Sequence, residues 1–191
     1  MIVGYQGEPG AFSDEAARRR FDNPDTRGYA TFDEVVEALS KGHVELALLP
    51  IENSIVGPIV GALAALERAR DVCTVDEIAH PVEQCLVGVR GASVETLVLV
   101  QSHPIALEQC RSFFSRNPHL RTQAVEDTAG AIRAIAQLGD MDVAAIGPAP
   151  AALRYGAVVL ARGIQDRRDN VTRFAIVAPA WGVGGAGMFG H

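Results

Sequence analysis

Short apolar segments alternate with helix-forming segments along most of this chain, and this alternation constrains the fold more than any other feature. The clearest apolar segment, residues 44–49, is almost continuously hydrophobic, as strands covered on both faces of a parallel sheet are. Before it, the capping box Thr31-Phe32-Asp33-Glu34 starts a predicted helix that ends at Lys41-Gly42, with glycine just after the last turn. The sequence therefore predicts an α/β fold.

The other predicted elements continue this alternation. Further strands are expected at 2–5, 72–78, 82–89, 97–100, 120–125, 143–146, 157–160 and 174–177, and further helices at 14–21, 58–70, 104–114, 128–138 and 151–155. His80-Pro81 favours extended backbone and marks a predicted crossover into a second lobe. The strand at 157–160 is expected to return the chain toward the first lobe. Residues 182–191 are rich in glycine and are expected to fray.

Composition argues against several classes of protein. Hydrophobic residues make up 48% of the 191 positions, enough to bury a core. A formal charge of -6 without a basic run argues against a nucleic-acid partner. The apolar region 144–161 is interrupted by two prolines and an arginine, so no membrane span is expected.

Cysteine usage predicts a reducing compartment. Cys73, Cys85 and Cys110 are odd in number and widely spaced, which indicates buried thiols rather than a disulfide framework. The sequence has no CxxC or HExxH spacing, so no metal site is expected. The first residues lead straight into a strand without a signal-peptide pattern, and we therefore expect the protein in the cytoplasm.

A glycine-rich turn joins the first predicted strand to the first predicted helix. Gly7 and Gly10 lie in this turn, and Ser13 is the predicted N-cap of the helix. Free backbone N–H groups at such a position can bind an anion. The glycine spacing matches neither the dinucleotide fingerprint nor the P-loop, so no nucleotide is inferred.

Polar residues also follow two later strands, where ligands bind in open α/β sheets. Asn53 and Ser54 follow the 44–49 strand, and they either contact a ligand or cap the next helix. Ser102 and His103 precede Pro104, a residue favoured in a first helical turn. For His103 a hydrogen-bonded structural role is slightly favoured over a titrating one.

The stretch 169–177 places a hydroxyl, a guanidinium and an aromatic ring on consecutive residues at the start of an apolar strand. Thr172 and Phe174 share one face of an extended strand, whereas Arg173 points to the other face. A bend at the strand start would let all three line one pocket. The alternative is an ordinary edge strand with a surface arginine.

Four stretches together resemble the prephenate dehydratase family, including its arogenate-using relatives. They are GYQGEPGAFS at 4–13, LLPIENS at 48–54, SHPIALEQC at 102–110 and NVTRF at 170–174. The resemblance implies two α/β lobes like those of type II periplasmic-binding proteins, each a mixed sheet flanked by helices, with the active site in the cleft between them. It implies a first lobe at 1–76 and 159–179, a second lobe at 77–158 and a glycine-rich tail at 180–191.

The resemblance also assigns site residues. The family's catalytic hydroxyl falls on Thr172. The implied substrate-binding set comprises Arg173, Phe174, Asn53, Ser54 and Gln109, to which the turn adds Gly7, Gly10 and Ser13 and the later strand end adds Ser102 and His103. Ile105, Gln84 and Pro148 depart from the family's common residues. The family's phenylalanine-binding ACT domain has no counterpart in these residues, and we leave open whether the natural protein continues beyond them.

The implied enzyme is a lyase of L-phenylalanine biosynthesis. It converts prephenate to phenylpyruvate with loss of carbon dioxide and water, and aromatisation drives the reaction, so no cofactor is expected. Thr172 is predicted to protonate the departing hydroxyl, while Arg173 binds one carboxylate bidentately and the glycine-rich turn binds another. Arogenate as substrate, or a non-catalytic module that binds a small anion, are the alternatives. A homodimer is left open.

Overall fold

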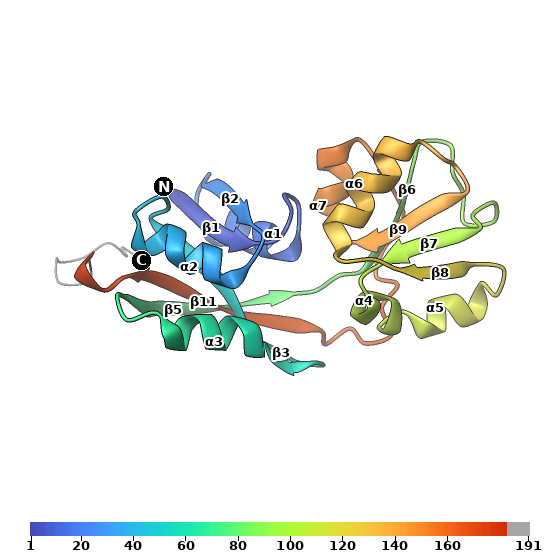
Figure 1. Cartoon of the computed structure of the whole chain (residues 1–191). Helices are drawn as coiled ribbons and strands as arrows, with labels where there is room; N and C mark the ends of the chain where they lie inside the picture. Colours follow the sequence, from blue (N-terminus) through green and yellow to red (C-terminus); the bar gives the residue numbers. More distant parts are fainter. Residues whose placement is uncertain (183–191) are drawn as a thin grey trace. The chain divides into compact units, whose positions relative to one another are not determined.

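The computed structural model describes residues 1–182 and divides them into two units, each with its own sheet and helices (Figure 1). Unit 1 comprises Met1–Gln6, Ala16–His80 and the chain from Val171 onward. Unit 2 comprises Gly7–Glu15 and Pro81–Asn170. In the described part of the chain, no helix has both the length and the apolar character needed to cross a membrane.

Unit 1 is built on a mixed six-stranded sheet. Its main path runs in the order β2 (Asp25–Tyr29), β1 (Ile2–Gln6), β3 (Leu46–Asn53), β11 (Val171–Pro179) and β5 (Val72–Pro81), and β4 (Gly57–Pro58) pairs with β3 outside this path. β1 is parallel to β2 and β3, whereas β11 is antiparallel to β3. The apolar strand predicted at 44–49 therefore lies inside the sheet, as its hydrophobicity requires.

Helices cover both faces of this sheet. α2 (Phe32–Ser40) and α3 (Val60–Arg68) pack on the face that carries Leu49, Ala175 and Val177. α1 (Phe12–Arg20) contributes Ala16 and Ala17 to the core on the face that carries Phe174 and Ile176. The alternation of buried residues along β11 thus supplies two hydrophobic cores from one strand.

Unit 2 repeats the layered arrangement with a five-stranded mixed sheet. The strand order is β10 (Val158–Ala161), β6 (Cys85–Gly88), β9 (Val143–Gly147), β7 (Leu99–Ser102) and β8 (Arg121–Ala124). One face packs on α6 (Thr128–Leu138) and α7 (Ala149–Tyr155), and the other packs on α4 (Pro104–Glu108) and α5 (Arg111–Arg116). The predicted mixed sheets flanked by helices are confirmed in both units.

Local capping signals gave the most accurate helix bounds. The Thr31 hydroxyl accepts a hydrogen bond from the Glu34 N–H at 3.2 Å, and the Glu34 carboxylate accepts one from the Ala30 N–H at 2.9 Å. Gly42 follows α2 with a φ of 70°. The Thr31 cap and the glycine stop are therefore confirmed, whereas the Glu34 carboxylate binds the N–H of the residue before the cap rather than that of Thr31.

Two helix predictions were wrong in detail. α1 begins at Phe12, so Ser13 lies inside the helix and is not its N-cap. The predicted helix 104–114 is divided into α4 and α5, and the break falls at Gln109 and Cys110. The strand β2 was not predicted, because its sequence Asp-Thr-Arg-Gly-Tyr is polar and lacks the apolar alternation of a half-buried strand.

The predicted lobe boundaries differ from the two units mainly at 7–15 and 159–170. β10 does not return the chain to unit 1, because it pairs antiparallel with β6. The 7–15 segment groups with unit 2, where the Tyr155 hydroxyl donates to the Pro9 carbonyl at 2.8 Å. In the predicted tail, Ala180–Gly182 forms a 3-10 turn, and residues 183–191 lie outside the described residues.

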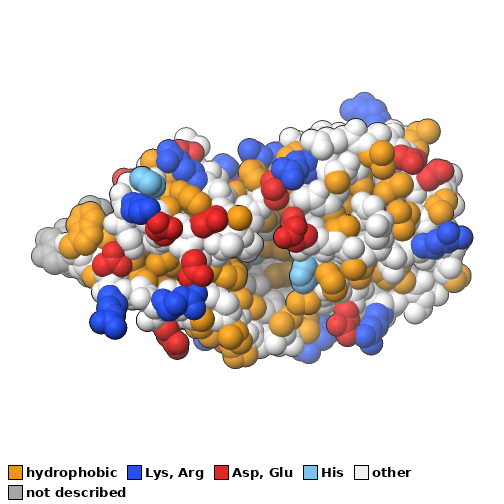
Figure 2. Space-filling view, in the orientation of Figure 1, with side chains coloured by type: hydrophobic (Ala, Val, Ile, Leu, Met, Phe, Trp, Pro, Cys, Tyr) orange, Lys and Arg blue, Asp and Glu red, His pale blue; other side chains and the backbone are white. Residues whose placement is uncertain are grey.

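Acidic and basic side chains are interspersed on the face drawn in Figure 2. Ion pairs also form within each unit: Arg20 Nη2 lies 3.0 Å from Asp76 Oδ2 in unit 1, and Arg133 Nη1 lies 3.0 Å from Glu8 Oε2 in unit 2. Because these side chains are partly exposed, each pair contributes about 0–1 kcal/mol to stability.

Candidate functional site

The Thr172 hydroxyl is held by an amide from the neighbouring strand. Thr172 lies opposite Asn53 in the antiparallel pairing of β11 with β3, and the Asn53 Nδ2 donates to Thr172 Oγ1 at 3.0 Å. The Asn53 Oδ1 accepts from the N–H groups of Ile55 and Val56 at 3.0 and 3.1 Å, which fixes the amide orientation. Both side chains are largely buried, since Thr172 is 9% exposed and Asn53 is 8% exposed.

Ser54 extends this contact along the backbone. Its Oγ accepts from the Val171 N–H at 2.9 Å, and its N–H donates to the Val171 carbonyl at 2.9 Å. α3 begins after Ile59 and has no side-chain cap. The alternative that Asn53 and Ser54 cap this helix is therefore wrong, because both side chains bind the start of β11.

Arg173 points away from Thr172. It is exposed between two buried neighbours, and it lies opposite Glu52 in the strand pairing. Its Nη2 lies 2.8 Å from Glu52 Oε2, and its Nε lies 3.3 Å from Glu77 Oε2. The bend that would bring Thr172, Arg173 and Phe174 into one pocket is not formed, because the normal alternation of a strand persists at its start.

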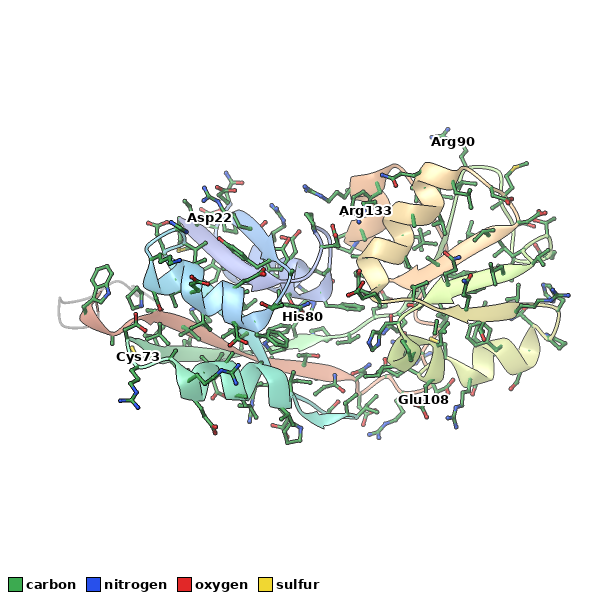
Figure 3. All side chains as sticks on the ribbon, in the orientation of Figure 1. Asp22, Cys73, His80, Arg90, Glu108 and Arg133 are labelled. Carbon is green, nitrogen blue, oxygen red and sulfur yellow. The ribbon has the colours of Figure 1, made fainter. Side chains whose placement is uncertain are left out.

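The Phe174 ring belongs to the core of unit 1. Only 1% of its surface is exposed, and it packs in a cluster with Leu48 and Ile176. The imidazole of His80, which is labelled at the end of β5 in Figure 3, lies against it edge-on with 6.4 Å between ring centroids. A direct contact of this ring with substrate stays a prediction. The nearly complete burial of the ring argues against such a contact.

Gln109 is bound by two other amides in unit 2. Its Oε1 accepts from Gln84 Nε2 and from Asn170 Nδ2, both at 3.1 Å. Its backbone carbonyl accepts from the Asp166 N–H at 2.7 Å, and the Asp166 carboxylate accepts from the Ser112 N–H at 2.9 Å. Residues at the break between α4 and α5 thus bind the segment 166–170, which leads into β11.

Ser102 and His103 both have structural partners. The Ser102 side chain is fully buried, and its Oγ donates to the Ile146 carbonyl of β9 at 2.7 Å. His103 is the N-cap of α4, and its Nδ1 accepts from the Ile105 N–H at 3.2 Å. The favoured structural role of His103 is confirmed, whereas substrate contact by either residue stays a prediction.

The glycine-rich turn uses part of its hydrogen-bonding capacity within the protein. The Gly10 N–H donates to the buried Asp14 carboxylate at 2.8 Å, and the Ala11 N–H donates to the Glu8 carbonyl at 3.0 Å. A Cβ on Gly10, whose φ is 90°, would lie 2.8 Å from the Cα of Ala151. An anion at this turn would therefore have to compete with Asp14 for the Gly10 amide.

The sequence did not predict the residues that form hydrogen bonds or ion pairs with the predicted site residues. Asn170 and Gln84 bind Gln109, Glu77 binds Arg173, and Asp14 binds the turn. A polar residue at 84, directly before an apolar strand, was the one local signal of such a buried contact. In the described chain, no group of three or more His, Cys, Asp or Glu side chains could hold a metal ion.

Two of the three free cysteines are buried in unit 2. Burial, with Glu83 as a second cause, raises the pKa of Cys85 from 9.0 to about 11, and burial, assisted by Asp166, raises the pKa of Cys110 from 9.0 to about 12. Both groups are therefore neutral thiols at physiological pH, and neither is activated as a nucleophile.

The raised cysteine pKa values predict a loss of stability in alkali. Their contribution is fully present below pH 9, the unfolded pKa, and is lost as the pH rises through about 11 and 12. We expect the free energy of unfolding to fall by about 1 kcal/mol per cysteine between about pH 8 and about pH 10. Urea unfolding at both pH values measures this loss. A Cys85→Ala/Cys110→Ala variant should lose correspondingly less stability, and an equal loss in both proteins would contradict the assignment.

Comparison with known proteins identifies related sequences over nearly the whole chain. The family model described as prephenate dehydratase matches residues 3–180. "Arogenate dehydratase/prephenate dehydratase 1, chloroplastic" of Arabidopsis thaliana is 40% identical over 176 residues, which are 92% of this chain and 44% of the relative. The chain thus spans less than half the length of this relative.

Solved structures agree on the fold. A prephenate dehydratase from Arthrobacter aurescens in complex with L-Phe is 26% identical, with a TM-score of 0.84 over 97% of this chain and 61% of the other. GqqA, described as a novel type of quorum quenching acylases, is 33% identical, with a TM-score of 0.87 over 94% of this chain and 64% of the other. A methionine-bound nutrient-binding protein from Burkholderia cenocepacia, 12% identical with a TM-score of 0.51 over 95% of this chain and 85% of the other, shares the fold alone.

Proposed function

The chain belongs to the prephenate dehydratase family, and we propose on this premise that it converts prephenate to phenylpyruvate, carbon dioxide and water. One observation carries the proposal: the Thr172 hydroxyl, to which the resemblance assigns catalysis, is held at 3.0 Å by the Asn53 amide. This hydrogen bond gives the hydroxyl a defined direction, which general acid catalysis requires.

In the proposed reaction, Thr172 supplies the proton that the leaving group needs. The Thr172 Oγ1 proton moves to the ring hydroxyl, the carbon–oxygen bond breaks, and water leaves. The electron pair of the ring carbon–carboxylate bond enters the ring as carbon dioxide departs, and the ring becomes aromatic. The Asn53 Nδ2 stabilises the negative charge that develops on Oγ1, and solvent then returns a proton to this oxygen.

Asn53→Asp is expected to lower kcat by about 10²-fold, within the range of a positioned acid group. A carboxylate cannot donate to Thr172 Oγ1, so the hydroxyl would turn its own proton toward the introduced carboxylate rather than toward substrate. Initial rates with prephenate measure the effect. Asn23→Asp is the matched control, because it makes the same chemical change at an exposed position outside the proposed site. An N53D rate close to the wild-type rate would contradict the proposed role.

Other contacts with the substrate remain proposals. The Gln109 Oε1 is engaged by two amides, so a contact with a substrate carboxylate would use its Nε2. Ser54 and Ser13 offer hydroxyl groups, and the 7–13 turn offers backbone N–H groups. We also propose a cytoplasmic location, which the free cysteines support; the homodimer stays a prediction.

The deciding experiment measures product formation from two substrates. Purified protein is given prephenate or arogenate, and phenylpyruvate is detected by its ultraviolet absorbance and phenylalanine by chromatography. Turnover of prephenate with the higher kcat/KM supports the proposal, and a preference for arogenate would assign the alternative activity. A rise in Tm with prephenate but no product would instead indicate a binding module. Because the chain is also similar to GqqA, a parallel assay measures acylase activity.

A further inference from the structure

Three side chains form a charged row across adjacent strands of unit 1. Glu52 comes from β3, Arg173 from β11 and Glu77 from β5, in the order in which these strands lie in the sheet. The Arg173 guanidinium contacts Glu52 through Nη2 at 2.8 Å and Glu77 through Nε at 3.3 Å. One guanidinium therefore links the central strand of the three to both of its neighbours.

This row lies on the opposite face of β11 from the Thr172 hydroxyl. Thr172 is buried and contacts Asn53, whereas Arg173 is exposed and contacts the two carboxylates. The pairing of β11 with β3 also becomes irregular between Arg173 and Phe174. The irregular step disrupts the ladder directly after Arg173. The first residues of β11 are therefore held by their contacts with Asn53 and Ser54 and by the side-chain links of Arg173.

We infer that Glu77 is a positioning residue for Thr172, acting through Arg173. The inference rests on the proposed function, because Thr172 is its catalytic group. Glu77 and Glu52 hold Arg173 from two sides, and this keeps the first residues of β11 in register with Asn53. The Arg173 guanidinium thus serves the geometry of the hydroxyl rather than binding a substrate carboxylate, because the negative charges of the two glutamates beside it oppose the approach of a third carboxylate.

The test compares kcat and KM in Glu77→Gln. This substitution keeps the size of the side chain but removes the charge that holds Arg173. We expect kcat for prephenate to fall about tenfold, because small displacements of a catalytic group are costly, and KM to stay within about twofold. In the Thr172→Ala background the same change should have no further effect on the residual rate. Asp76→Asn is the matched control, because Asp76 is the preceding residue on β5 and pairs with Arg20 instead.

Two kinetic results would overturn the inference. A large change in KM with an unchanged kcat would mean that Arg173 binds substrate directly. An equal fall in rate for E77Q with and without the Thr172 hydroxyl would mean that Glu77 acts on the protein as a whole.

A readout independent of activity separates this inference from the proposed function. Hydrogen exchange of the peptide that begins β11 should become faster in E77Q and not in D76N. If the wild-type protein turns over neither prephenate nor arogenate, the proposed function fails, and the exchange rates alone decide whether Glu77 holds the strand. Unchanged exchange in E77Q would reject the inference.

Discussion

Thr172→Ala is expected to lower kcat for prephenate by about 10²–10⁴, the contribution of a positioned general acid. The substitution removes the proton donor and leaves Asn53 Nδ2 without its side-chain acceptor on β11. Continuous measurement of phenylpyruvate absorbance gives the rate. Circular dichroism and thermal unfolding verify that the variant remains folded.

Two further substitutions at Thr172 separate the hydroxyl from the shape of the side chain. Thr172→Ser keeps the hydroxyl and should retain most of the activity, whereas Thr172→Val keeps the shape and should be as slow as alanine. Near-native turnover by a folded valine variant would refute the proton-donor role.

Phe174→Ala is expected to have the largest effect on stability, about 3–5 kcal/mol in the free energy of unfolding. The ring is 1% exposed and lies among apolar side chains from β3, β11 and α1, so truncation leaves a cavity in unit 1. Urea unfolding at neutral pH measures the loss. A Phe174→Leu variant should lose less, because it refills part of the volume.

Val60→Ala provides a surface control for this experiment, since the Val60 side chain is 73% exposed. It should change stability by about 0.5 kcal/mol or less. If Phe174→Ala left stability unchanged and raised only KM for prephenate, the ring would be a substrate contact, and its assignment to the core would be wrong.

Local sequence patterns were sufficient for the features that depend on neighbouring residues. The helix α6 was predicted with both of its bounds, and in the structure Asp127 caps its start while Gly139 ends it with a φ of 71°. The strand β3 was recognised from its apolar run, and the NVTRF stretch located the start of β11. Caps, turns and periodicity act over a few residues, so a short window of sequence contains their cause.

The partners of these residues could not be predicted in the same way. Gln109 binds Asn170, which is 61 residues away, and Asn53 binds Thr172, which is 119 residues away. The sequence around Arg173 is the same whether its guanidinium contacts two glutamates or a ligand. Only the neighbouring strands decide between these alternatives.

By itself, the sequence determined the class of fold, the family and the position of the hydroxyl at the start of a strand. Tertiary structure alone decided that β10 pairs with β6, that the glycine-rich turn packs in unit 2, and that Arg173 faces away from Thr172. Strand pairing and side-chain contacts join residues far apart in the chain, and their free energies depend on register and burial, which no local pattern encodes.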